Sequence, residues 1–156
     1  RRTDGVLVQR RLQPVGIMFS EFYFYLAGFI VPKEKEKLKF EIENDPFPTI
    51  YRIDRINSFS VTETHFAVPY SKRFEEGEFR KRIQFMYGGH LQRLRFLFKG
   101  NSYEYILDRL PTAKVVAEGE NGTIIEAEVF GKGIDIWLKS QGELIEVISR
   151  QEIPVN

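Results

Sequence analysis

The chain has 156 residues, 42% of them hydrophobic, which is enough for one domain or two small ones and excludes a disordered chain. It contains no cysteine, so disulfide frameworks, thiolate nucleophiles and cysteine-based metal sites are excluded. The longest apolar run, Phe22–Val31, is about half of the roughly 20 residues that a membrane helix needs. We therefore expect a soluble, cytoplasmic protein.

The net charge is +1, but charge is distributed unevenly along the chain. Residues 1–99 hold 18 Lys and Arg against 12 Asp and Glu, a net of +6, whereas residues 100–156 hold 5 against 10, a net of −5. A first part that faces a polyanion would explain this difference, and so would chance segregation of surface charge.

The first predicted strand follows a tight turn. Asp4-Gly5 is a favoured two-residue hairpin turn, so Arg1 and Arg2 are expected to end one strand and Val6–Leu12 to form the next. Because the first strand of this hairpin is so short, we expect upstream residues to be missing. Pro14 is expected to end the second strand.

The central predicted strand is the aromatic segment Glu21–Ile30. One face carries Phe22, Phe24, Leu26 and Ile30, and the other carries Tyr23, Tyr25 and Phe29. Because both faces are apolar or aromatic, we expect a strand that is covered on each side, with Phe22, Phe24 and Leu26 on the inner wall of a small barrel. The hydroxyl groups of the tyrosines then need partners.

Short segments with turn signals complete the first 68 residues. The alternating Lys and Glu of Pro32–Lys39 predict a solvated loop or edge, and the prolines of Glu41–Pro48 predict a loop. Ile50–Ile56 and Ser58–Val61 have strand character. Five or so short strands in roughly 65 residues indicate a small β-barrel over residues 1–68, closed so that no edge is exposed.

Residues 69–90 are predicted to be a linker followed by a helix. From Phe74 to Met86 the apolar period is that of a helix, with Phe79 and Ile83 on one face, and Gly88-Gly89 is expected to end it.

Residues 91–156 show the order strand, helix, strand, strand, helix, strand, which predicts a ferredoxin-like domain. The predicted elements are a strand at Leu91–Phe98, a helix capped by Asn101 and closed by Pro111, strands at Ala113–Ala117 and Thr123–Phe130 joined near Asn121-Gly122, a short helix around Trp137 and Leu138, and a strand at Leu144–Ile148. The expected fold class is thus mostly β plus α+β.

The motifs of common catalytic sites are missing from the sequence. There is no phosphate-binding P-loop, no glycine-rich dinucleotide motif and no zinc-protease motif. The two histidines, His65 and His90, have no cysteine or carboxylate spaced to complete a metal site. We therefore expect a protein with no metal, no cofactor and no enzymatic activity.

The segment Tyr51–Ile56 holds two arginines, Arg52 and Arg55, in an apolar strand pattern, where they are costly unless they meet anions. One interpretation is a salt bridge to Asp54 with the guanidinium groups otherwise solvated. The other is an anion site in which an arginine grips phosphate beside stacking tyrosines. On strict alternation the two arginines face opposite sides, so a single site requires a bulge or a bend.

Three motifs resemble the successive signatures of a WYL domain, a family named for a Trp-Tyr-Leu motif. They are Arg10-Arg11-Leu12-Gln13-Pro14, Phe24-Tyr25-Leu26 and Tyr51-Arg52-Ile53-Asp54-Arg55-Ile56. The segment from the Phe74 helix through Trp137-Leu138 to Glu146-Val147-Ile148 resembles the C-terminal extension of that domain. The resemblance covers nearly the whole chain, with Phe24 in place of the motif Trp and without the Ser and His that some members carry.

This resemblance implies the effector-sensing part of a bacterial transcription regulator, lacking its N-terminal helix-turn-helix. It implies an N-terminally truncated Sm-like, SH3-type barrel over residues 1–68, the extension over residues 91–156, and a homodimer that contacts double-stranded DNA through the absent domain. It also implies a nucleotide or single-stranded nucleic acid effector, bound by Tyr25, Arg52 and Arg55, with Arg10 as a further candidate. The alternative is a dimerisation or structural module whose arginines are neutralised internally.

Overall fold

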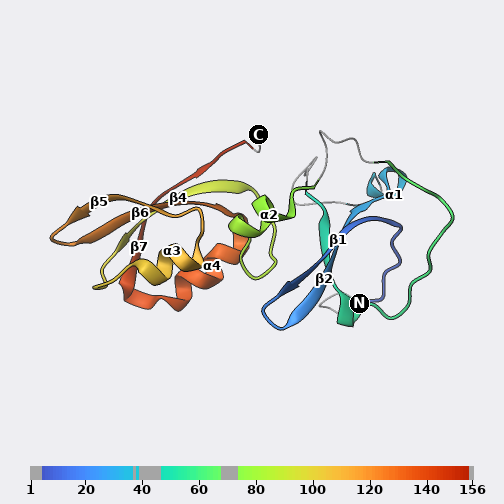
Figure 1. The fold of residues 1–156 in the computed structure, drawn as a ribbon, viewed down its shortest axis with the longest axis horizontal. Helices are drawn as coiled ribbons and strands as arrows, with labels where there is room; N and C mark the ends of the chain where they lie inside the picture. Colours follow the sequence, from blue (N-terminus) through green and yellow to red (C-terminus); the bar gives the residue numbers. More distant parts are fainter. Residues whose placement is uncertain (1–4, 37, 39–46, 68–73, 155–156) are drawn as a thin grey trace. The chain divides into compact units, whose positions relative to one another are not determined.

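The computed structural model describes residues 5–36, 38, 47–67 and 74–154, and the chain divides into two compact units, residues 1–76 and 77–156 (Figure 1). In the described residues the units contain two antiparallel sheets, one of three strands and one of four, together with four α-helices. No helix in this part of the chain is long and apolar enough to cross a membrane. The fold is therefore of mixed α and β class, and each unit is described by itself.

The first unit is built on a three-stranded sheet with strand order β1-β2-β3. Its elements are β1 (Leu12–Ser20), β2 (Tyr23–Ile30), α1 (Pro32–Lys35), β3 (Thr49–Arg52) and the 3-10 turn η1 (Ile53–Arg55). The sheet is open, and the described residues of this unit form no closed barrel. The loop predicted at Pro32–Lys39 begins instead with the helical turn α1, and most of the loop predicted at Glu41–Pro48 lies outside the described residues.

Strand β1 begins where the sequence pattern predicted a strand to end. A strand was predicted for Val6–Leu12, but the residues before Leu12 form none. Pro14, which was expected to end that strand, lies inside β1. Because β1 is an edge strand and its register slips between Pro14 and Gly16, the missing N–H of proline is tolerated there. The hairpin turn predicted at Asp4-Gly5 depends on residues 1–4, which lie outside the described part of the chain.

Strand β2 alternates as predicted, but its faces are covered differently. Phe22 and Phe24 are exposed and Leu26 is half-buried, so the prediction that they form the inner wall of a barrel is wrong. Buried side chains occur on both faces of the hairpin, because Met18 and Ala27 are buried on the face of Tyr25 and Ile30 is buried on the face of Phe24. Alternation alone could not distinguish these faces, because both are apolar.

Strand β3 is shorter than the predicted strand Ile50–Ile56. It ends at Arg52, where η1 begins, and Ser58–Val61 is exposed and forms no strand. Arg52 and Asp54 are held together by two hydrogen bonds across this bend, an arrangement that favours a turn over an extended chain.

The second unit contains the predicted order of elements. After α2 (Glu76–Arg82) come β4 (Leu91–Phe98), α3 (Glu104–Arg109), β5 (Lys114–Gly119), β6 (Gly122–Phe130), α4 (Gly131–Ser140), the 3-10 turn η3 (Gly142–Leu144) and β7 (Ile145–Glu152). The strand order is β5-β6-β4-β7, and all neighbouring strands are antiparallel. The bounds of β4 are those predicted.

The core of the second unit lies between one face of this sheet and the helices α3 and α4, which lie on the same side of it (Figure 1). Its residues, all buried, are Leu94, Phe96, Phe98, Ile106, Leu110, Ile125, Ala127, Val129, Ile134, Trp137 and Leu138. Because side chains alternate along a strand, the residues between the apolar ones of β4, Arg93 and Arg95, lie on the other face. This face carries the charged side chains described below.

Two helix ends differ from the predictions. Helix α2 stops at Arg82, well before the predicted glycines, and it is followed by a tight turn in which Phe85 and Met86 adopt left-handed backbone angles with φ of 51° and 55°. Helix α3 begins after Tyr103 without a side-chain cap, so the predicted capping by Asn101 is wrong.

Two isoleucines on α4 test this core. Ile134 is fully buried, so Ile134→Ala should lower the free energy of unfolding by about 2–5 kcal/mol, because it leaves a cavity. Ile136, two residues further on, is exposed, so Ile136→Ala should cost at most about 0.5 kcal/mol. Urea unfolding followed by circular dichroism measures both, and equal losses would contradict the assigned helix face.

Candidate functional site

The candidate site of the first unit is centred on Arg52, which β3 places opposite Tyr25 of β2. The Cζ atom of Arg52 lies 3.4 Å from the ring centroid of Tyr23. Its Nε and Nη2 atoms donate hydrogen bonds of 3.0 and 2.6 Å to the two carboxylate oxygens of Asp54. The guanidinium group is thus held between an aromatic ring and a carboxylate.

The strand pairing explains this arrangement. Tyr23 and Tyr25 are two residues apart and share one face of β2, so Arg52 is opposite one ring and diagonal to the other. An arginine on this strand position is therefore within reach of both rings.

The electrostatics of the site place Arg55 close to the same groups. Partial burial raises the pKa of Tyr25 above its ordinary value of 10.0, and the positive charges of Arg52 and Arg55 oppose this rise. The hydrogen bonds from Arg52 lower the pKa of Asp54, and the charge of Arg55 lowers it further. The bend that a shared site requires is η1, which carries Asp54 and Arg55.

The fourth predicted residue, Arg10, lies elsewhere. It donates a hydrogen bond of 2.9 Å to the carbonyl oxygen of Gln9. Burial raises the pKa of Tyr51, and the charge of Arg10 opposes this rise, so Arg10 is near Tyr51. Since Tyr51 precedes Arg52 in β3, its side chain points to the other face of the sheet. The structure therefore brings together three of the four predicted residues.

Sequence reasoning missed the contact of Tyr23 with Arg52. The only available signal was the spacing of two residues between Tyr23 and Tyr25, and it does not say which strand lies beside them. The partner became visible only with the register of β2 against β3.

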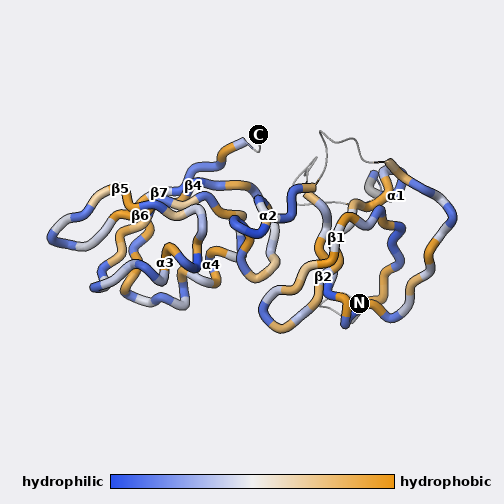
Figure 2. The backbone as a smooth tube through the Cα atoms, in the orientation of Figure 1, coloured by the Kyte–Doolittle hydropathy of each residue, from blue (hydrophilic) through white to orange (hydrophobic). Residues whose placement is uncertain are grey.

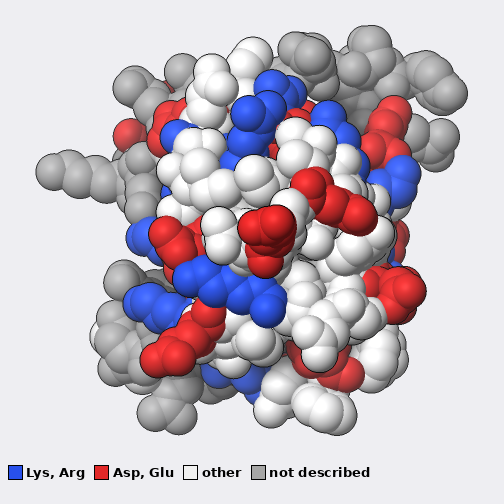
Figure 3. All heavy atoms as spheres, turned by 90° about the vertical axis from the view of Figure 1, so that its left-hand side faces the viewer, with Lys and Arg blue, Asp and Glu red and all other residues white. Residues whose placement is uncertain are grey.

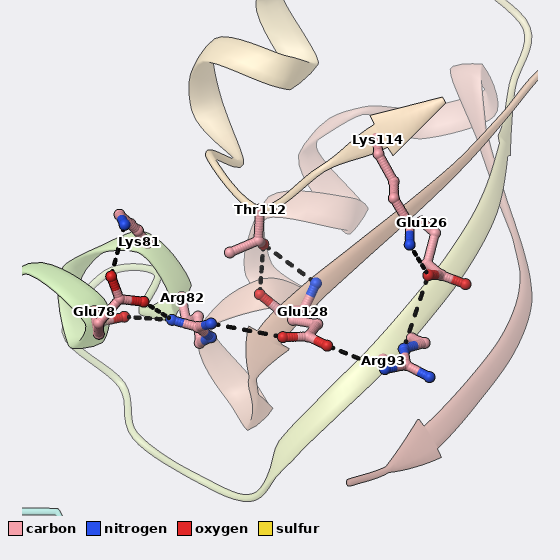
Figure 4. Close-up of polar contacts among 8 residues, drawn as sticks. All are labelled: Glu78, Lys81, Arg82, Arg93, Thr112, Lys114, Glu126 and Glu128. Carbon is pink, nitrogen blue, oxygen red and sulfur yellow. Dashed lines mark hydrogen bonds and ion pairs between the residues drawn. The ribbon is translucent and has the colours of Figure 1, made fainter. Parts of the chain in front are cut away.

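A second polar cluster lies on the charged face of the second unit. Glu126 of β6 is buried, and its carboxylate accepts hydrogen bonds from Arg95 of β4 at 2.6 Å and pairs with Lys114 of β5 at 3.0 Å. These partners, Lys114 first, lower the pKa of Glu126. Figure 4 shows this carboxylate between Lys114 and Arg93, whose Nε lies 3.8 Å from it.

The cluster continues to α2. Arg93 pairs with Glu128 at 3.1 Å, Glu128 with Arg82 at 3.6 Å, and Arg82 with Glu78 at 2.8 Å (Figure 4). Acidic and basic groups alternate along this chain of contacts, and they are also intermingled on the surface seen in Figure 3. The arginines of the cluster are held by protein carboxylates, an arrangement that stabilises the sheet face.

The described residues contain no group of three or more His, Cys, Asp or Glu that could hold a metal ion.

Neither models of known protein families nor curated protein sequences match this chain. The function must therefore be inferred from the geometry of the sites. The groups at the Arg52 site, a cation fixed on one aromatic ring and opposite another, are suited to binding an anion that carries a flat ring.

The role of Glu126 can be tested by its pH dependence. Because its pKa is lowered from the ordinary value of 4.5, its carboxylate stabilises the fold above that value, and this contribution is lost as the pH falls through the lowered pKa. Glu126→Gln should lower the free energy of unfolding by about 1 kcal/mol at neutral pH, because charge-assisted hydrogen bonds are lost beside partly solvated partners.

The measurement is urea unfolding of both proteins at a series of pH values. The difference between them should shrink as the pH falls from about 4.5, where the carboxylate of the unfolded chain is protonated, through the lowered pKa of the folded protein. Glu143→Gln, at an exposed position of η3, is the control. A difference that stays constant down to the lowest pH would contradict the proposed role of the charge.

Proposed function

We propose that this chain is the effector-sensing part of a bacterial DNA-binding transcription regulator and that it binds a nucleotide or single-stranded nucleic acid. The first unit would be a WYL domain of the Sm-like barrel type, and the second its ferredoxin-like extension. A separate helix-turn-helix domain would contact DNA, and the protein would act as a cytoplasmic homodimer. The observation that carries this proposal is the stacking of Arg52 on Tyr23, opposite Tyr25.

This arrangement suits the two parts of a nucleotide. Bases stack on aromatic side chains with about 1–3 kcal/mol per base, and an arginine can bind phosphate through two parallel hydrogen bonds. Because Tyr23 already orients Arg52, less side-chain entropy is lost when an anion binds. Arg55 adds a second positive charge close to Tyr25.

The architecture supports the proposal in part. The order of elements in the second unit and the strand order β5-β6-β4-β7 agree with a split β-α-β arrangement of the ferredoxin-like type. The open sheet β1-β2-β3 agrees with part of a small barrel, whose closure would need further strands.

One observation favours the alternative, a structural or dimerisation module without a ligand of its own. Asp54 already pairs with Arg52 through both carboxylate oxygens, which is how an arginine is neutralised internally. Both interpretations can be reconciled with the pair, because a phosphate could replace Asp54 as the partner of Arg52. They differ in the effect that removing the charge of Asp54 would have.

Binding is tested by fluorescence anisotropy with labelled single-stranded oligonucleotides and with labelled nucleotides. Binding should weaken as salt increases, because phosphate contacts release counterions. Arg52→Ala and Arg55→Ala should each weaken it about tenfold, because each removes a charge-assisted contact. Lys139→Ala, on the exposed side of α4, removes one positive charge elsewhere and is the matched control.

The variant Asp54→Asn distinguishes the two functions. If Asp54 competes with phosphate for Arg52, this variant should bind oligonucleotide more tightly than the wild type. If the pair is purely structural, the variant should lose stability and gain no binding. Absence of binding to every oligonucleotide and nucleotide, with the fold verified by circular dichroism, would refute the sensor proposal.

A further inference from the structure

The hairpin of β1 and β2 carries an exposed apolar surface on the face opposite to Arg52. Phe19 lies opposite Phe24, and Ile17 lies opposite Leu26. The exposed fractions are 61% for Ile17, 52% for Phe19, 58% for Phe24 and 86% for Phe22 beside the turn. We call these four residues the hairpin patch; Figure 2 shows the hydrophobic colouring of this hairpin.

The composition of this face indicates the class of partner. The side chains that share it on the three paired strands include Leu26 and Tyr51, and none of the residues paired there with the patch is charged. The positive charge near this face is that of Arg10, which lies beside Tyr51 and outside the four residues of the patch. Nucleic acid binding needs cations for the phosphates, whereas the centres of protein interfaces are depleted of charge and rich in aromatic residues. The hairpin patch therefore fits a protein surface.

The area of the patch approaches what a stable contact needs. A phenylalanine that is fully buried removes about 150–250 Å² from water, so the three exposed phenylalanines present roughly 300–500 Å² at the fractions given above. This equals the largest apolar patches of monomeric proteins, which are often functional. Two such patches in contact would bury roughly 600–1,000 Å² from phenylalanine alone, and Ile17 and its neighbours extend this toward the roughly 1,200 Å² of a stable interface.

We propose that the hairpin patch is the contact surface between two copies of this chain related by a twofold axis. Homodimer interfaces are more apolar than those between different proteins, and a twofold axis brings the same patch from both copies together. The rings of Phe19 and Phe24 are tilted by 56° with centroids 5.1 Å apart, so they offer both an edge and a face to aromatic partners.

This proposal assigns a surface to the homodimer that was proposed above, and it does not depend on the ligand. The patch and the Arg52 site use opposite faces of one sheet, since Phe24 and Tyr25 are consecutive in β2. Dimerisation and ligand binding can therefore fail separately and are measured by different experiments.

The test is analytical ultracentrifugation of the whole chain over a wide range of concentrations. The wild type should form dimers, and Phe24→Lys and Ile17→Lys should each raise the dissociation constant of the dimer about tenfold or more, because each places a charge in a desolvated contact. Phe59→Lys is the matched control, since Phe59 is equally apolar, is exposed and lies outside the strands. It should leave the dissociation constant unchanged, and circular dichroism verifies the fold of each variant.

A second measurement covers the case in which a variant does not fold. Amide hydrogen exchange of the wild type in residues 17–24 should slow as the protein concentration rises. A wild type that stays monomeric, a dimer that neither substitution weakens, or protection of these residues that does not depend on concentration would each overturn the proposal. The last result would mean that the same chain covers the patch.

Discussion

The register of β2 against its two neighbours determines where each residue of interest in the first unit lies. It places Tyr25 opposite Arg52 on one face and Phe24 opposite Phe19 on the other. Because side chains alternate along a strand, a slip by one residue would exchange these two sets. The aromatic–guanidinium site and the exposed apolar patch thus depend on one pairing.

In both units, arginines on strands pair with carboxylates, but the carboxylates of the two units differ in burial. Glu126 is buried and has cationic partners on two neighbouring strands, so removing any partner would leave charge in a poorly solvated place. The side chain of Asp54 is 50% exposed and that of Arg52 is 22% exposed, so under the proposed function a phosphate could reach the pair from the solvent side and replace Asp54. This contrast is the physical reason why the Arg52 site, and not the cluster of the second unit, is the candidate for ligand binding.

The two proposals assign a separate role to each face of the first sheet. The face with Tyr25 and Arg52 combines rings with positive charge, which suits a nucleotide. On the other face the paired rings of Phe19 and Phe24 have no charged residue between them, which suits another protein surface. Both sets of residues lie on β2 and the strands paired with it. A sensor that acts within a dimer would thus have its ligand site and its subunit contact in one small sheet.

The sequence by itself determined the second unit well, because its signals are local and agree with one another. The alternation of Leu94 and Phe96 with Arg93 and Arg95 leaves only one face that can be buried, and a turn near Asn121-Gly122 joins the two following strands. In the first unit the sequence indicated the strand character of β2. It also offered a salt bridge between Arg52 and Asp54 as one of two interpretations. It could not decide which face of β2 is covered, since Phe24 and Tyr25 fit either side equally well. Only the tertiary structure decided this, together with the end of β3 at Arg52, because pairing partners and burial depend on residues that are distant in the chain.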